Sequence, residues 1–329
     1  LAFLAVGLVV GALVERLLGP PGRRRRSPLR LLALGSLLST LVLVGVAVGG
    51  YLWASSVFDR IEKIDVGSQL SHGSGTNYLL VGSDNGRDPD DQREGVDGSR
   101  SDTILVLRVA SGQATMLSLN RDLWVDNPAT GRKGRLNATY NAGPANLIAA
   151  VTQNFGIPID RYLEIDFSSF AGLVDAFGGI DVTFAHPALD RASGLNVPTA
   201  GVVHLDGTQA LAYVRSRHYT EVIGGKEVPE GGLPDVNRTG RQQTFLRELF
   251  AEAAHQRSPL TLMHAATGMA DGLRIDDRMT LVDAARFAWS MGRLHPVSVV
   301  LPVVPRRTSG GADVLDLGAG ADGVLAAFR

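Results

Sequence analysis

The sequence predicts an α/β protein, in which helices cover a largely buried sheet, preceded by a membrane-spanning helix. The layered part is predicted because apolar runs of strand length alternate at short spacing with apolar runs of helix length. The spanning helix is predicted because Leu31 to Trp53 contains no charged residue. Such a run is long enough for a bilayer core, which takes roughly 20 residues.

The charges around the apolar N-terminus predict the topology. Arg23 to Arg26 and Arg30 precede the spanning segment, residues 31–54, and mixed charge follows it. The positive-inside rule then places the arginines in the cytoplasm and the rest of the chain outside the cell membrane. No small-residue cleavage pattern follows, so we expect an anchor and not a removed signal peptide. Residues 1–22 form a second apolar segment. It is either a first spanning helix, which would form a helical hairpin with the second one across the cytoplasmic loop 23–30, or an extension from a misassigned start. We favour the helical hairpin.

Composition excludes several classes of protein. The 329 residues are 45% hydrophobic and 20% charged, which is ordinary for one large domain plus a membrane region. The net charge of −1 provides no global field for nucleic acid. Cysteine is absent, which excludes thiol catalysis, cysteine-ligated zinc and disulfides, and is compatible with an exported domain.

The exported domain is expected at 77–329, after a flexible juxtamembrane linker at 55–76. Its polar segment 218–234 contains three glycines and two prolines and is interpreted as a lid. Strands are predicted at 77–84, 103–109, 114–119, 161–167, 180–184 and 297–304, and helices at 145–155, 168–177, 206–214, 235–255 and 259–289.

Charged side chains gather at the ends of the first three strands. Buried strands expose their polar groups at the rim of a sheet, where groups from different strands meet. Carboxylates there could hold a metal ion, and arginines could hold phosphate oxygens. These residues are Asp84, Arg87, Arg100, Asp102, Arg121 and Asp122.

Further arginines follow at later element ends: Arg135, Arg215, Arg217, Arg238 and Arg241. One such arginine is usually a solvated surface group, but the number of them favours an anion site. In a helix, Arg238, Arg241 and Gln242 are three and four residues apart and share one face. Arginine is preferred over lysine where two oxygens are held bidentately.

Familiar nucleophile motifs are absent. The chain has no G-x-S-x-G elbow, no P-loop and no H-E-x-x-H helix. Chemistry without a protein nucleophile suits phosphoryl transfer, in which positioning and charge neutralisation do most of the work.

At these residues the chain resembles the LytR-CpsA-Psr family of membrane-anchored glycopolymer ligases. The similarity extends in the family's order from about Asn77 to the end of the chain. It is carried by Val81-Gly82-Ser83-Asp84 with Arg87, Arg100 to Thr103, Ser118 to Asp122, Leu136 to Ala138 through Tyr140, Ile165 to Phe167, Gly178 to Ile180, Ala210 to Tyr213 with Arg215 and Arg217, and Arg238 to Gln243.

The resemblance implies a three-layer α/β/α sandwich with a mixed central sheet. It implies transfer of a glycan phosphate from a polyprenyl-pyrophosphate carrier to a peptidoglycan hydroxyl at the cell membrane, with Mg²⁺ (or Mn²⁺) on the pyrophosphate. By motif position, Asp84 and Asp102 are the metal-side carboxylates, and Arg121 or Asp122 assists the incoming hydroxyl. The catalytic residues are Arg121 and Asp122 together with Arg215 and Arg217. The residues that hold the pyrophosphate are Arg87, Arg100, Arg135, Arg238, Arg241 and Gln242.

Three departures from the family pattern leave the charged residues in place. Asn120 stands where proline is usual, Arg135 where lysine is common, and Asn237 where glycine is usual. The family's apolar groove would draw on the residues Leu147, Ile148, Val151, Phe170, Val174 and Phe177, which periodicity describes equally as plain core. Two other functions stay open: a pyrophosphatase acting on the same lipid, and a non-catalytic envelope regulator or lipid-binding protein.

Overall fold

The structure is a computed structural model that describes residues 28–84, 100–232, 234–256, 258–291, 293–294 and 296–329. The predicted segment 1–22 and Arg87 lie outside these residues. The chain divides into two units, Leu1–Asp59 and Arg60–Arg329.

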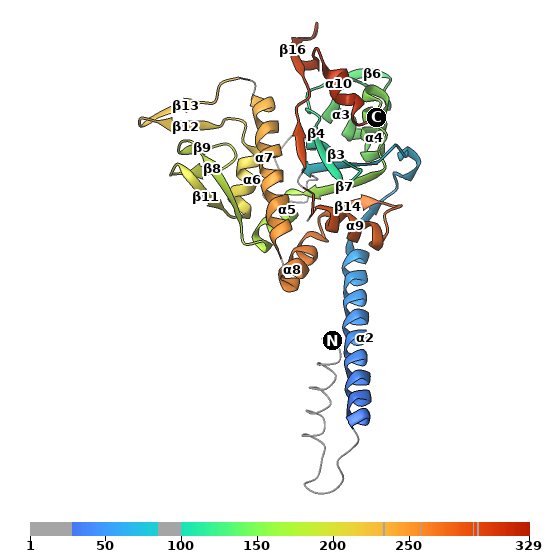
Figure 1. The fold of residues 1–329 in the computed structure, drawn as a ribbon. Coiled ribbons are helices and arrows are strands. Elements are labelled where there is room, and N and C mark those ends of the chain that lie inside the picture. The colour runs from blue at the N-terminus through green and yellow to red at the C-terminus, as the bar shows by residue number, and fades with distance from the viewer. Residues whose placement is uncertain (1–27, 85–99, 233, 257, 292, 295) are drawn as a thin grey trace. The chain divides into compact units, whose positions relative to one another are not determined.

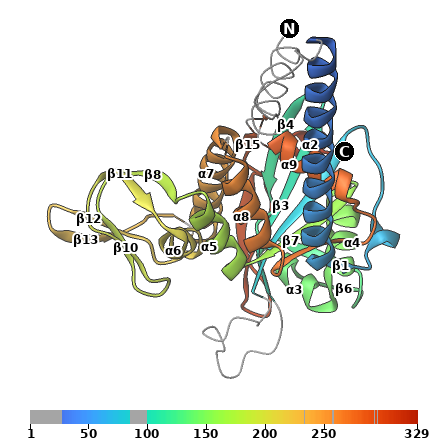
Figure 2. The same cartoon turned by 90° about the horizontal axis from the view of Figure 1, so that it is seen from below.

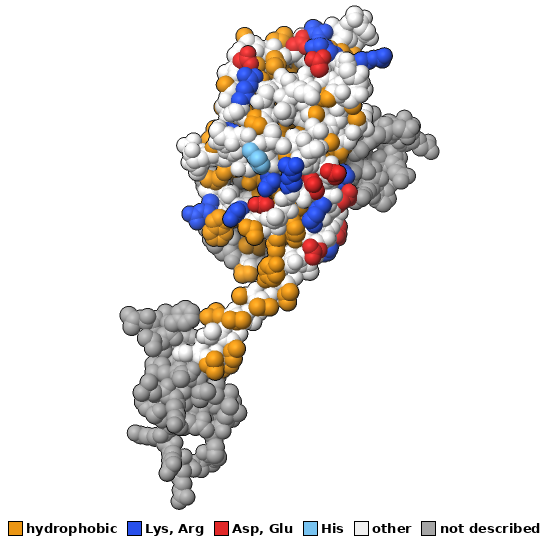
Figure 3. All heavy atoms as spheres, turned by 90° about the vertical axis from the view of Figure 1, so that its right-hand side faces the viewer, with side chains coloured by type: hydrophobic (Ala, Val, Ile, Leu, Met, Phe, Trp, Pro, Cys, Tyr) orange, Lys and Arg blue, Asp and Glu red, His pale blue; other side chains and the backbone are white. Residues whose placement is uncertain are grey.

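The described part of the first unit is a long apolar helix, α2 (Pro28–Arg60), which runs on into the first residue of the second unit. Most of its side chains from Leu37 to Leu52 are exposed, with Leu41 at 59% and Val46 at 68%, and hydrophobic groups follow one another along it (Figure 3). By length and composition it can cross a membrane, as predicted for 31–54. The helix continues six residues beyond that predicted end.

The second unit is built on a mixed sheet that has seven strands in the described part of the chain (Figure 1). Strand β2 pairs in parallel with β7 and antiparallel with β3, which pairs antiparallel with β4. The strand order is β1 (Glu62–Ile64), β14 (Leu273–Asp276), β7 (Arg161–Asp166), β2 (Thr76–Asp84), β3 (Arg100–Ala110), β4 (Gln113–Ser118) and β15 (Val297–Val299).

Helices cover both faces of this sheet, as Figures 1 and 2 show. Along β3, Ile104 and Val106 face one core and Leu105 and Leu107 face another, as expected for a strand buried on both sides. The first core is closed by α3 (Leu136–Thr139), α4 (Pro144–Phe155) and α10 (Ala321–Ala326), and the second by α7 (Pro234–His255) and α9 (Leu281–Met291). The predicted α/β/α sandwich is confirmed.

A smaller lobe extends from the sheet around α6 (Gly207–Arg215) and has its own apolar core. Helix α5 (Phe167–Ala176) and α7 contribute to this core through Val174 and Phe245. The lobe's strands are β8 (Ile180–Phe184), β9 (Ala188–Asp190), β10 (Leu195–Val197), β11 (Gly201–Leu205), β12 (Thr220–Ile223) and β13 (Lys226–Pro229).

The polar segment 218–234 differs from the predicted lid loop, because β12 and β13 form a hairpin in it and β12 also pairs with β9. The hairpin turn is Gly224-Gly225, with φ values of 58° and 78°. Two consecutive residues at positive φ are what a two-residue hairpin requires, so these glycines set a turn.

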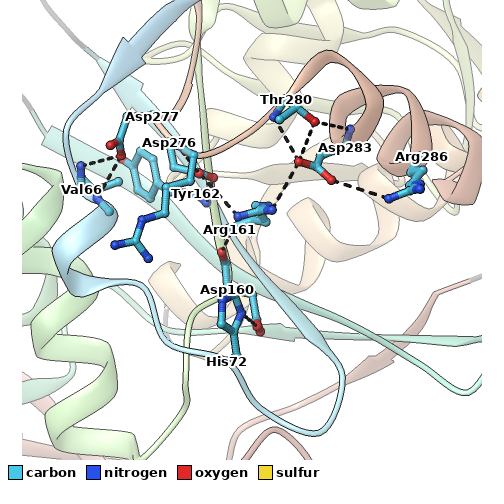
Figure 4. Close-up of polar contacts among 12 residues, drawn as sticks. Val66, His72, Asp160, Arg161, Tyr162, Asp276, Asp277, Thr280, Asp283 and Arg286 are labelled. Carbon is cyan, nitrogen blue, oxygen red and sulfur yellow. Dashed lines mark hydrogen bonds and ion pairs between the residues drawn. The ribbon is translucent and has the colours of Figure 1, made fainter.

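The expected linker 55–76 also differs, because β1 joins the sheet beside β14. Asp277 accepts hydrogen bonds from the backbone nitrogens of Val66 and Gly67, at 3.3 and 3.0 Å. His72 Nδ1 lies 2.9 Å from Asp160 Oδ1 (Figure 4). Strands of three or four residues carry too little periodicity to be recognised in a sequence. This explains why β1 was not predicted, and why β14 lies within a stretch, 259–289, that was predicted to be helical.

The remaining elements are short. Helix α8 (Pro259–Met269) packs against α5. The others are η1 (Gly67–Gln69), η3 (Tyr140–Ala142) and the pairs β5 (Trp124–Asn127) with β6 (Arg132–Arg135) and β16 (Val303–Arg307) with β17 (Asp313–Leu317). The six apolar residues considered for a groove belong to two separate cores, Leu147, Ile148 and Val151 to the first sheet core and Phe170, Val174 and Phe177 to that of the lobe.

Candidate functional site

One edge of the central sheet collects the ends of β2, β4 and β7, since these three strands run in the same direction. Ser83 of β2 lies opposite Asp166 of β7, and Asp84 lies opposite Arg100 of β3. The register shifts beyond Gly82, so that Asp102 lies at an irregularity of the β2–β3 ladder. The side chains of Asp84, Arg100 and Asp102 lie outside the described residues.

The turn after β4 brings two arginines to one carboxylate. Asp122 lies 3.6 Å from Arg121 Nε and 3.2 Å from Arg135 Nε. The side-chain oxygen of Asn120 accepts a hydrogen bond from the backbone nitrogen of Asp122 at 3.1 Å. This Asx turn fixes the chain at the position where the family usually has proline. Asp122 therefore orients both guanidinium groups at this edge.

Helix α6 delivers Arg215 to the same edge. Its guanidinium carbon lies 4.5 Å from the ring centroid of Phe167, over the ring face. Phe167 follows Asp166 directly and begins α5, so Arg215 is held beside the end of β7. At its other end α6 is capped by Asp206, which accepts a hydrogen bond from Gln209 N at 2.8 Å.

Asp190 positions the segment that follows Arg215, a role that the sequence did not reveal. The residue is 1% exposed. One of its oxygens accepts from Ser216 Oγ at 2.7 Å, Arg217 N at 2.9 Å and His218 N at 2.8 Å. Burial acts to raise the pKa of Asp190, but the hydrogen bonds outweigh it and lower the pKa below its usual value. The backbone of Arg217 is thus tied to a buried carboxylate.

The start of α7 is fastened to the end of α6. Arg238, Arg241 and Gln242 are all buried, and arginine is seldom buried without a partner. Arg241 donates to the carbonyl of Ser216 at 2.7 Å, and Gln242 donates to the carbonyl of Val214 at 3.1 Å. The shared helix face that the sequence predicted is therefore turned toward the Arg215–Arg217 segment.

Arg241 has two further partners from the hairpin region. Its guanidinium carbon lies 4.8 Å from the ring centroid of Tyr219, and one terminal nitrogen is ion-paired with Glu230. Its buried Nε has no hydrogen-bond partner among the described residues. Burial raises the pKa of Tyr219, so its hydroxyl stays protonated. Arg241 thus keeps unused capacity for an anion.

A cavity of about 410 Å³ lies between the end of β4 and the start of α7. Its lining is mostly apolar, with Val236, Val300, Leu301 and Val303 among the lining residues. Amide and hydroxyl groups, which can hydrogen-bond a saccharide or a phosphate, supply most of the polar part, together with one carboxylate and one guanidinium. The polar lining residues are Ser118, Asn120, Tyr213, Glu230, Asn237, Thr239, Arg241, Gln243 and Thr244. The cavity therefore joins the Asn120 turn to the buried arginine of α7.

A second carboxylate that sequence reasoning missed, Glu164 on β7, lies beneath this edge and is 1% exposed. Its Oε1 accepts from Ser83 Oγ at 2.5 Å and Tyr140 Oη at 2.6 Å, and its Oε2 accepts from Tyr162 Oη at 2.7 Å. Arg274 Nη1 lies 3.1 Å from Oε1. Burial raises the pKa of Tyr162 well above its usual value, and the Glu164 charge adds to the effect. The network holds Ser83 in place, next to Asp84.

The contacts above join the predicted residues in two groups: Arg121, Asp122 and Arg135 after β4, and Arg215, Arg217, Arg241 and Gln242 where α6 meets α7. Arg238 is buried on the same helix as the second group. It does not describe Arg87 or the side chains of Asp84, Arg100 and Asp102. Within the residues it does describe, no three His, Asp or Glu side chains form a metal-binding group. Asp190, Glu164 and Glu230 gave no signal because isolated carboxylates resemble solvated surface groups until their burial is known.

Comparison with known proteins identifies relatives of this arrangement. Residues 55–287 match the model of the LytR_cpsA_psr family. A probable cell wall biosynthesis protein, LcpB of Corynebacterium glutamicum, is 36% identical over 239 residues, which are 70% of this chain and 53% of the relative. A polyisoprenyl-teichoic acid–peptidoglycan teichoic acid transferase, TagU of Enterococcus faecalis, is 32% identical over 66% of each chain. The match thus spans about half of the first relative and just under two thirds of the second.

Solved structures share the fold. A LytR-Csp2A-Psr enzyme from Actinomyces oris superposes with a TM-score of 0.67 at 26% identity, over 82% of this chain and 96% of that one. TagT of B. subtilis gives a TM-score of 0.56 at 21% identity, over 82% of this chain and 93% of that one. At that identity the likeness to TagT concerns the fold alone.

Proposed function

The chain belongs to the LytR-CpsA-Psr family, and from this premise we propose that it is a membrane-anchored phosphotransferase. It moves a glycopolymer from a polyprenyl-pyrophosphate carrier onto a peptidoglycan hydroxyl. The names of the relatives support this proposal, since TagU is a polyisoprenyl-teichoic acid–peptidoglycan transferase and LcpB a probable cell wall biosynthesis protein. The domain would lie outside the cell membrane, with α2 as its anchor.

The observation that carries the proposal is that arginines from four parts of the chain gather in two groups, and that one cavity is lined by Asn120 beside the first group and by Arg241 of the second. Arg121 and Arg135 share Asp122, while Arg241 and the Arg215–Arg217 segment are joined through Ser216. Each charge-assisted hydrogen bond to a phosphate contributes about 1.5–3 kcal/mol, so several would bind a pyrophosphate firmly. An arrangement of this kind suits an anion with two linked phosphates.

In the proposed reaction the acceptor hydroxyl attacks the phosphorus that carries the glycan. A new oxygen–phosphorus bond forms, the bond to the bridging oxygen breaks, and polyprenyl phosphate leaves. Arg215 and Arg217 stabilise the charge that spreads over the transferred phosphoryl oxygens. The hydroxyl proton passes to a base on the Arg121–Asp122 side. Asp122 is the carboxylate available there, and its two arginine partners keep it oriented.

A divalent cation, Mg²⁺ or Mn²⁺, belongs to the proposal as well. Carboxylate oxygens are the ligands that Mg²⁺ prefers, which fits Asp84 and Asp102 at the β2–β3 end of this edge. When bound, the ion would neutralise pyrophosphate charge. The remaining work of binding and orientation falls to the arginines.

The test is turnover by the full chain in lipid nanodiscs with Mg²⁺, a polyprenyl-pyrophosphate saccharide and peptidoglycan oligomers, read by mass spectrometry. The proposal predicts saccharide joined to the oligomers, and loss of the product with Arg215→Ala. Arg191→Ala is the matched control, because Arg191 lies in the same lobe and makes an exposed ion pair with Glu227. Free sugar phosphate as the only product would identify a pyrophosphatase, and normal function of Arg215→Ala would identify a regulator.

A further inference from the structure

Helix α8 has an unusual surface composition. The stretch from Ser258 to Ala270 contains no Asp, Glu, Lys or Arg. Leu260 is 67% exposed and Leu262 is 44% exposed. A helix on the surface of a water-soluble domain normally turns charged residues outward, and an exposed apolar group of this size indicates an interaction site. α8 therefore exposes apolar side chains and no charged ones, which suits an apolar partner.

The neighbouring helix α9 adds an aromatic and basic face. Val282, Arg286 and Trp289 are spaced i, i+4 and i+7, so they share one side of the helix. Val282 is 56% exposed and Trp289 is 69% exposed. The guanidinium carbon of Arg293 lies 5.7 Å from the Trp289 ring centroid. Tryptophan together with arginine is typical of the boundary between lipid headgroups and acyl chains.

The route of the chain indicates which partner covers these helices. Residues 31–58 carry no charge, and at 1.5 Å per residue this run is about 42 Å long. It exceeds the bilayer core of roughly 30 Å, and α2 continues without a break to Arg60. The uncharged run therefore ends two residues before Arg60, which is the first residue of the second unit.

Arg60 is fixed to the end of α8. Its Nε donates to Asp271 Oδ1 at 3.1 Å, and a second nitrogen of the same guanidinium contacts the other oxygen. Asp271 comes two residues after α8. In Figure 1, α8 and α9 lie on the lower side of the second unit. The second unit thus begins, at Arg60, next to the end of α8, and Arg60 directly follows the apolar run of α2 in the chain.

We propose that Leu260 and Leu262 of α8, with Val282 and Trp289 of α9, form a docking face that rests in the headgroup region of the anchoring bilayer. The inference rests on the anchor in the proposed function and adds a second, separate membrane contact. The headgroups contact Arg286 and Arg293, and the exposed apolar side chains enter the boundary of the acyl chains.

This face is connected to the candidate site by a short path. Gly272, next to Asp271, accepts a hydrogen bond from Asp166 N at 3.0 Å. A side chain at Gly272 would collide with Ser169 Oγ and the Asp166 carboxylate, so the turn after α8 is packed tightly on the end of β7. Phe167, which supports Arg215, follows Asp166. Docking would hold the sheet edge at a constant height above the lipid surface, where the pyrophosphate of a lipid-linked substrate lies.

The absence of cysteine allows a direct test on the full chain. Single cysteines replace Leu260, Trp289, Val202 and Val42, each carries a nitroxide label, and the protein is placed in nanodiscs containing phosphatidylglycerol. Collision rates with oxygen, which concentrates in lipid, and with a water-soluble nickel chelate report the depth of each label. Val202 is the matched control, because it is 69% exposed in the lobe and far from α8 in sequence.

We expect labels at 260 and 289 to show a ratio of oxygen to nickel collisions several-fold above that at 202. The docking face would be overturned, and the anchor left intact, if the oxygen-to-nickel ratios at 260 and 289 were as low as that at 202 while the ratio at Val42→Cys was high, as expected for a label in lipid. An oxygen-to-nickel ratio at Val42→Cys as low as that at 202 would overturn both the anchor and the docking face. Product formation in the transferase assay is scored separately, so that failure of the enzymatic proposal is distinguished from either result.

Discussion

The substitution Asp190→Asn tests whether one buried carboxylate positions the catalytic arginines. Asp190 accepts three hydrogen bonds from Ser216, Arg217 and His218 on one oxygen. Its other oxygen accepts two, from Ala192 N at 2.9 Å and Ser193 N at 3.4 Å. An asparagine replaces one of these oxygens with a donor, so at least one buried donor loses its acceptor and the others lose a charged one. We expect roughly 3 kcal/mol of lost stability, at about 1–3 kcal/mol for each affected bond.

Two measurements check this expectation. The loss corresponds to a melting temperature lower by about 6–12 °C for a domain of this size, measured by calorimetry. At a temperature where both proteins are folded, kcat should fall roughly 100-fold, because a displaced Arg217 no longer meets the transferred phosphoryl group. Asp206→Asn is the matched control, since Asp206 caps the same helix and asparagine caps equally well. Equal melting and equal turnover of the two variants would refute the positioning role.

The pH dependence of the same carboxylate has a definite sign. Its folded pKa lies below the ordinary value, so the unfolded state binds the proton more readily and stability rises with pH. The contribution is complete above the unfolded pKa of about 3.9 and is lost as pH falls through the folded pKa. The difference in melting temperature between wild type and Asp190→Asn should therefore be constant from pH 7 to 5 and shrink in more acidic buffers.

Three further predictions follow from the site and the docking face. Glu230→Gln should lower the KM for the lipid substrate about threefold to tenfold, since removing a competing anion of Arg241 gains about 1 kcal/mol; a raised KM would show that Glu230 helps to bind substrate. Glu164→Leu should lower the melting temperature by more than 6 °C, because Arg274 loses a buried partner worth about 3 kcal/mol, whereas Glu248→Leu on exposed α7 surface should not. The double variant L260E/L262E should lower turnover of substrate in nanodiscs roughly tenfold and leave turnover of a water-soluble short-chain analogue unchanged.

The sequence predicted most of the fold because its strongest patterns are long. The apolar run of α2, the apolar run of β3 and the α4 pattern stopped by Gly156 each extend over many residues. Short strands such as β1 and β14 were not predicted, because three or four residues provide no period and acquire their place only by pairing across the chain. The β12–β13 hairpin was interpreted as a flexible loop because glycine content signals mobility and tight turns alike.

The site was predicted unevenly for a similar reason. Arginines at element ends stand out because several of them repeat the same context. The residues that hold them, Asp190 and Glu164, do not, because their importance depends on burial. Phe167 is equally ordinary in the sequence, yet its ring supports Arg215. Partners of this kind become visible only when the fold brings distant segments together.

The start of α7 shows why these supporting contacts bear on function. Arg238 and Arg241 are both buried in the first three turns of α7. Burying such charge is costly without compensation. For Arg241 that compensation comes from Glu230, whose backbone nitrogen donates to Tyr219 O at 2.9 Å where the β12–β13 hairpin closes. A phosphate that enters the cavity would compete with this carboxylate for the guanidinium of Arg241, so the ion pair that allows Arg241 to be buried also sets how strongly it can bind a substrate anion.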